Sequence, residues 1–146
     1  SEFAGTVPVR HLLPYWKTSN RYLFSGGSVN MRDAAVYAKE ENWSKAVELW
    51  KQTYETKKGK QKMYAAYNTA LGYEMQDSID TALEWALKAQ TLAREKSKTD
   101  KKETGEIHDG TISYYIFISM YVDELEKRKE GMARLNMQMN RFDDDF

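Results

Sequence analysis

Small and aromatic residues recur along residues 31–93 with a period of 36. Ala34 and Tyr37, three positions apart, share one face of a predicted helix, and Ala70 and Tyr73 repeat this pair. The later matched pairs are Trp43 and Ile79, Ala46 and Ala82, Trp50 and Ala86, and Thr53 and Ala89. A fixed period of this length is typical of stacked supersecondary units. The region is therefore predicted to contain two copies of one structural unit.

Each copy has the pattern of a helical hairpin, in which a short polar break separates two amphipathic segments. A single hairpin cannot bury its apolar side alone and must pack on a neighbour. Asn30 is predicted to cap the first helix, Gly59 to follow the second in the left-handed conformation, and Asp77 or Ser78 to cap the fourth. The four helices are predicted over residues 31–41, 43–58, 60–75 and 78–96.

The order of small residue, Tyr, turn, apolar residue and small residue resembles the tetratricopeptide repeat. Two copies in strict register carry the resemblance, which covers residues 31–93. The period is two residues longer than usual, the closing proline is absent, and Ala86 stands where a large aromatic is common, with Trp85 beside it. The resemblance implies an all-α fold, a tetratricopeptide-like right-handed αα-superhelix.

A fifth helix is predicted over residues 106–129, because apolar residues recur there at three- and four-residue steps. It is apolar on more than one face, so it is predicted to be either sandwiched between helices or available as an interface, including one that forms a homodimer. Gly131 is a candidate end, after which residues 132–142 either fold back as a sixth helix or extend the fifth. The charged run over residues 94–106 is predicted to be a solvated helix end and loop.

Residues 1–29 do not have a helical pattern, since Pro8 and Pro14 interrupt them. They are predicted to form an irregular arm with either a short strand or an extended strap at residues 21–24. Two compatible interpretations of the arm remain. In the first, the arm is a remnant of a preceding β-rich region. In the second, the arm lies on the helices, and Trp16 and Phe24 cover the end of the first hairpin. The predicted organisation is an arm at 1–29, a helical domain at 30–142 and an exposed, disordered acidic tail at 143–146.

A second resemblance rests on several short runs within residues 14–71. The runs are Pro14-Tyr15-Trp16, Arg21-Tyr22-Leu23-Phe24, Gly26-Gly27, Asn42-Trp43 and Ala65-Ala66-Tyr67-Asn68-Thr69-Ala70-Leu71. They are similar to the C-terminal part of uncharacterised secreted, lipoprotein-like proteins of Bacteroidetes. This resemblance implies that the chain is a piece of a longer exported protein, periplasmic or attached to the outer membrane.

Charge and composition narrow the classes of partner. The chain has 22 basic and 22 acidic residues, so its zero net charge argues against general nucleic-acid binding. No apolar run approaches the roughly 20 residues that a membrane-spanning helix needs. Cysteine is absent, which excludes disulfides and thiol chemistry.

No motif predicts a catalytic, metal or cofactor site. His11 lies in the arm, and His108 beside Asp109 has no nucleophile tied to it by any motif. The sequence Gly26-Gly27-Ser28 precedes a helix but lacks the fingerprint of a phosphate loop, so a turn is predicted there.

The remaining candidate is the concave groove of the helical repeat, where tetratricopeptide arrays bind peptides. Of the residues that clamp a peptide carboxylate in such arrays, only Asn68 has a match, because Met31 and Ala35 occupy the first-helix positions. Clamp-type binding is therefore not expected. Candidate groove residues for a ligand or peptide are Arg32, Tyr64, Tyr67 and Asn68, although the same side chains can instead bind the arm.

The predicted function is a non-enzymatic protein-interaction or scaffold module of a larger exported protein. The alternative is a small-ligand or glycan-binding module, which requires at least two of five aromatics to be exposed together. Those five are Trp16, Trp43, Trp85, Tyr64 and Tyr67. A third possibility, a hydrolase or transferase site around His108 and Asp109, requires a pocket beside them.

Overall fold

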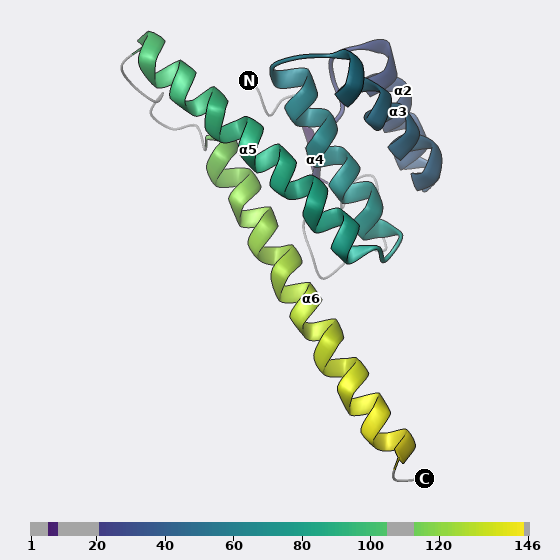
Figure 1. Ribbon diagram of the computed structural model, residues 1–146. Coiled ribbons are helices and arrows are strands. Elements are labelled where there is room, and N and C mark those ends of the chain that lie inside the picture. Colours follow the sequence, from purple (N-terminus) through teal and green to yellow (C-terminus); the bar gives the residue numbers. More distant parts are fainter. Residues whose placement is uncertain (1–5, 9–20, 105–112, 145–146) are drawn as a thin grey trace.

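The computed structural model describes residues 6–8, 21–104 and 113–144, and these form a helical protein with a small two-stranded sheet (Figure 1). The all-α prediction is thus confirmed. Helices α2, α3, α4 and α5 pack side by side in chain order, and α6 packs antiparallel along α5. The element bounds are β1 Thr6–Pro8, β2 Tyr22–Phe24, α2 Val29–Lys39, α3 Trp43–Thr56, α4 Lys60–Met75, α5 Ile79–Thr104 and α6 Tyr114–Asp144.

The turns inside the two hairpins have the same backbone conformation, 36 residues apart. Glu41 and Asp77 both adopt the left-handed region, with φ of 63° and 62°. In each turn a backbone N–H reaches the carbonyl five residues earlier, from Asn42 to Tyr37 at 2.8 Å and from Ser78 to Tyr73 at 2.9 Å. The period found in the sequence therefore corresponds to a repeated turn geometry.

Helix α4 lies between α3 and α5, and its residues from 65 to 72 are all buried. Close approach to α3 requires Gly72, since a Cβ there would lie 2.3 Å from a Val47 methyl group and 3.2 Å from the Trp50 ring. Small residues on α5, including Ala82, Ala86 and Ala89, are buried on its α4 side of the core. This close packing makes α4 the centre of the molecule.

The N-terminal segment is extended at the predicted place but packs elsewhere than expected. Strand β2 pairs antiparallel with β1, Val7 opposite Leu23. Phe24 is buried against α4 and α6, so the prediction that it covers the end of the first hairpin is wrong. Between α4 and α6 the Phe24 ring meets other aromatic rings, and the strand backbone meets side chains that form hydrogen bonds with it. Trp16 and Pro14 lie outside the described residues.

Helix α2 begins two residues before the predicted start. Ser28, not Asn30, is its N-cap, and the Ser28 hydroxyl accepts the backbone N–H of Met31 at 3.4 Å. The expected boundary at residue 30 is wrong because an earlier capping side chain was available. Gly59 has the predicted positive φ, 64°, directly before α4.

The two C-terminal helices are longer than predicted. Helix α5 continues to Thr104 through the charged run, whose Lys and Glu residues are good helix formers, so the loop prediction is wrong up to that point. Residues 105–112 lie outside the described ranges, and α6 begins at Tyr114 rather than 106. Gly131, which is half-buried, neither ends nor breaks α6, because a single glycine costs a helix interior only about 1 kcal/mol.

The second half of α6 projects away from the other helices (Figure 1). We call residues 129–144 the overhang. The overhang is a direct continuation of α6, the fifth helix predicted from the sequence, and does not fold back as a separate helix. Asp143 and Asp144 belong to the overhang rather than to a separate tail. No helix in the described ranges is both long and apolar enough to cross a bilayer.

Candidate functional site

Strand β2 lies between α4 and α6, in a place that we call the groove, and the Asn68 side chain forms hydrogen bonds with the strand backbone. The Asn68 side-chain oxygen accepts the backbone N–H of Phe24 at 3.0 Å, and the Asn68 amide donates to the Phe24 carbonyl at 2.7 Å. Asn68 is fully buried in the middle of α4, where an unpaired amide would be costly. Its two bonds therefore fix the strand in register without reference to side-chain identity.

Aromatic rings surround the Phe24 side chain. Its ring stacks on Tyr64 with 4.1 Å between centroids, and Tyr67, Tyr114 and Phe117 present their edges at 5.3, 6.0 and 6.2 Å. Such geometries add about 0.5–1.5 kcal/mol per pair beyond simple burial. The groove thus contains a specific site for one aromatic residue.

Two tyrosine hydroxyls complete the contacts of the groove. The Tyr67 hydroxyl donates to the Tyr22 carbonyl at 2.6 Å, a second bond to strand backbone. The hydroxyls of Tyr64 and Tyr114 share a hydrogen bond at 2.6 Å, which joins α4 to α6 above the Phe24 ring. The bound segment is therefore held by α4 and enclosed by α6.

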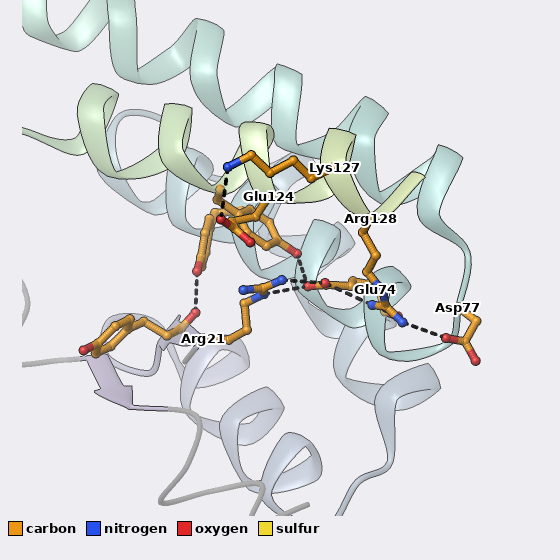
Figure 2. Close-up of polar contacts among 9 residues, drawn as sticks. Arg21, Glu74, Asp77, Glu124, Lys127 and Arg128 are labelled. Atoms are coloured by element: carbon orange, nitrogen blue, oxygen red, sulfur yellow. Dashed lines mark hydrogen bonds and ion pairs between the residues drawn. The ribbon is translucent and has the colours of Figure 1, made fainter. Parts of the chain in front are cut away.

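A buried carboxylate, Glu74, anchors the other end of the strand (Figure 2). Arg21 donates to it through Nε at 3.1 Å and Nη2 at 3.0 Å. Tyr121 donates its hydroxyl at 2.8 Å, and Arg128 donates Nη1 at 3.0 Å from the opposite side. Arg128 also reaches Asp77 at 3.1 Å. We call Arg21, Glu74, Tyr121 and Arg128 the Glu74 cluster.

Burial and ion pairing oppose one another in this cluster. Burial raises the pKa of Glu74, but the hydrogen bonds and charges of Arg21, Tyr121 and Arg128 outweigh it, so the net pKa is below its ordinary value. For Arg21, burial lowers the pKa, and the Glu74 carboxylate more than offsets that effect. Burial raises the pKa of both Tyr67 and Tyr121, to which the Glu74 charge adds. The cluster is therefore an ionised carboxylate with neutral phenols around it.

Of the predicted groove residues, the structure brings Tyr64, Tyr67 and Asn68 together around β2. Arg32 is exposed on α2, and no described residue pairs with its guanidinium. Arg32 and Asn68 occupy equivalent repeat positions, yet only the second hairpin faces α6 and the strand. The prediction that Arg32 lines the groove together with these residues is therefore wrong.

The sequence prediction missed the Glu74 cluster entirely. One signal was present, since Glu74 stands at the repeat position of Ala38, a buried alanine in the first hairpin. A charge at an apolar repeat position needs a partner. The partners Arg21, Tyr121 and Arg128 lie about 50 residues away in sequence, so no local pattern identified them.

The other candidate sites have no structural counterpart in the described ranges. His11, His108 and Asp109 lie outside them, and within them no group of three or more metal-ligating residues forms. Gly27 adopts a φ of 116° in the predicted turn before α2. An open surface depression of about 620 Å³ lies along α3, lined by Lys51, Gln52 and Tyr73 among others.

The exposed aromatic cluster required for glycan binding does not form among the described residues. Trp43, Trp85 and Tyr67 are 7%, 8% and 1% exposed, and Tyr64 is half-buried beneath Phe24. Most of these rings instead fill the helix core. Glycan binding stays a prediction, since the fifth aromatic residue, Trp16, lies outside the described residues.

Comparison with known proteins places the chain in a family. No curated protein and no solved structure shows significant similarity to the chain. A family model described as a domain of unknown function (DUF6340) matches residues 32–127, from α2 into the first half of α6. The matched range includes Asn68, Glu74 and Tyr121 and ends directly before Arg128. Since this range is well over half of the sequence, the chain belongs to the DUF6340 family.

Proposed function

We propose that the chain is a non-enzymatic protein-interaction module whose groove between α4 and α6 binds an extended peptide segment. In the structure described here that segment belongs to the chain itself. The single observation that supports the proposal is the pair of Asn68 bonds to both backbone groups of Phe24. Binding backbone by a side-chain amide, with a pocket for one side chain, is the chemistry of peptide recognition.

The broader setting of this proposal is a tetratricopeptide-like right-handed superhelix within a larger exported protein. The 36-residue period and the two matching turns at Glu41 and Asp77 support the repeat. Binding the segment that precedes α2 fixes the direction in which the chain enters the helices. A module of this kind holds a neighbouring region in place and leaves its outer helices available to a protein partner.

The test is complementation in the full chain. Phe24→Ala removes the aromatic anchor and weakens the chain's own segment, which opens the groove. A labelled peptide with the sequence of residues 21–26 is then titrated by fluorescence anisotropy. We expect the Phe24→Ala chain to bind this peptide at least tenfold more tightly than the wild type, in which the internal segment competes at high effective concentration.

The control is Phe24→Ala combined with Asn68→Ala, which should weaken peptide binding about tenfold because two hydrogen bonds are lost. If Phe24→Ala lowers the helical circular dichroism signal, the peptide is expected to restore it. Binding that is unchanged by Asn68→Ala contradicts the proposal. So does a Phe24→Ala chain that neither binds the peptide nor regains helicity with it.

A further inference from the structure

Helix α6 carries one continuous stripe of residues with alternating four- and three-residue spacing, apolar at every position but one. This is the a and d spacing of a coiled-coil heptad, and the only charged member is Arg128. The stripe runs through both the packed half and the overhang. Its nine positions are Tyr114, Ile118, Tyr121, Leu125, Arg128, Met132, Leu135, Met139 and Phe142.

The stripe is buried in the first half of α6 and exposed in the second. Ile118 and Leu125 are fully buried against the helical body. Met132, Leu135, Met139 and Phe142 are 38%, 54%, 57% and 63% exposed, because the other helices end before them (Figure 1). A stripe that is buried along one half of a helix and exposed along the other half indicates that a partner helix packs on the exposed half.

We propose that the overhang pairs with the overhang of a second copy of this chain as an antiparallel two-helix coiled coil. This inference rests on the proposed interaction role and names one partner, at a surface separate from the groove. In antiparallel coiled coils a residues face d residues. Centring the pair on residue 137 places Met132 opposite Phe142 of the partner subunit, and Leu135 opposite Met139 of the partner subunit. All four exposed stripe residues then meet an apolar residue of the other copy.

Charge favours the antiparallel orientation. A parallel pair would place the Arg128 residues of the two copies in one layer, whereas the antiparallel pair keeps them at opposite ends. In the antiparallel register Lys129 and Asp143 fall at e positions that face one another across the pair, so the partner's Asp143 approaches the existing ion pair of Lys129 with Asp80. The two helical bodies then lie at opposite ends of the pair.

The length of the overhang sets the strength of the pair. Sixteen residues span about 24 Å, or roughly two heptads. Such a short overlap buries less than about 1,200 Å², the lower end for stable interfaces. We therefore expect a reversible dimer with a Kd on the order of micromolar to tens of micromolar.

Sedimentation equilibrium of the full chain tests the pairing. Between about 1 and 500 µM, the mass is expected to rise from that of a 17.0 kDa monomer toward twice that value. Leu135→Lys, on the stripe, should keep the chain monomeric at all these concentrations. Met137→Lys is the matched control, since Met137 is 59% exposed in the same overhang but off the stripe, and it should dimerise as the wild type does.

Orientation is tested by disulfide formation, because the chain has no cysteine of its own. A mixture of Met132→Cys and Phe142→Cys chains should yield mostly the mixed disulfide under mild oxidation. Mainly symmetric disulfides, a monomer at every concentration, or equal effects of Leu135→Lys and Met137→Lys would overturn the proposal. Groove binding is measured separately in the Leu135→Lys variant, so failure of the dimer and failure of the groove are distinguishable.

Discussion

The two halves of α6 have the same stripe of residues and opposite surroundings. From Tyr114 to Leu125 the stripe is buried against α5, α4 and the bound strand. From Met132 to Phe142 its residues are 38–63% exposed. An amphipathic pattern thus specifies which face of a helix is to be covered, but not what covers it. In the first half the cover is local, and in the second half we infer that it is another copy.

The first half differs in one further respect, which is a polar connection through the core. Tyr121 and Arg128 both donate to Glu74 on α4, and Arg21 reaches the same carboxylate from the strand. Three separate segments of the chain are thereby joined at one buried charge. The overhang has no equivalent contact with the body beyond the exposed ion pair between Lys129 and Asp80, at 3.0 Å, among the described residues.

Replacing Glu74 should have the largest effect on the packed half. Glu74→Gln leaves Arg21 buried without its counter-charge, so we expect a loss of about 3–5 kcal/mol in the free energy of unfolding at pH 7. Because the pKa of Glu74 is lowered in the folded state, its stabilisation is present above about pH 4.5 and is lost as the pH falls through the folded value. Urea unfolding of both chains at pH 7 and pH 3 measures the loss in unfolding free energy and its change with pH.

The gap in unfolding free energy between the wild type and Glu74→Gln should accordingly narrow at pH 3. An exposed carboxylate provides the control, and Glu84→Gln on α5 is expected to change stability by less than about 0.5 kcal/mol at either pH. A gap that stays constant between pH 7 and pH 3 would show that the Glu74 charge does not contribute to stability.

Two leucines of the stripe compare the halves directly. Leu125→Ala creates a cavity in the core and should cost about 2–5 kcal/mol. Leu135→Ala, in the overhang, should cost less than about 0.5 kcal/mol at a concentration where the chain is monomeric, because Ala is also a strong helix former. Thermal unfolding monitored by circular dichroism at low micromolar concentration measures both losses. Similar losses for the two variants would contradict the conclusion that the overhang does not pack on the other helices.

Among the predicted losses at buried residues of the packed half, the smallest should come from the removal of one hydroxyl. Tyr121→Phe keeps the ring against Tyr67 but removes the 2.8 Å bond to Glu74, at an expected cost of about 1.5–3 kcal/mol. Tyr73→Phe is the matched control, since the Tyr73 hydroxyl makes only an exposed 3.4 Å bond with Lys51. It should cost less than about 0.5 kcal/mol. Equal costs for the two changes in chemical denaturation would argue against a special role for the Glu74 cluster.

Local sequence predicted the elements well where local energetics decide them. The range 60–75 for α4 agrees with the structure, and the positive φ at Gly59 follows from the residue type. The loop expected within 94–106 was wrong up to Thr104, because Lys and Glu are good helix formers. Of the two alternatives left open after Gly131, the structure has the continuous helix. Asn68 was predicted as a groove residue through its repeat position, whereas Glu74 was not.

The sequence by itself determined the period of 36, the all-helical class and the apolar positions on either side of Gly131, but not that a single helix carries them. These follow from backbone propensity and from the need to bury apolar side chains, both of which are readable over a few turns of helix. Only the tertiary structure decided that β2 occupies the groove and that Arg21, Tyr121 and Arg128 meet at Glu74. Those contacts join residues about 50 positions apart, and their energy depends on a shared desolvated environment that no single segment possesses.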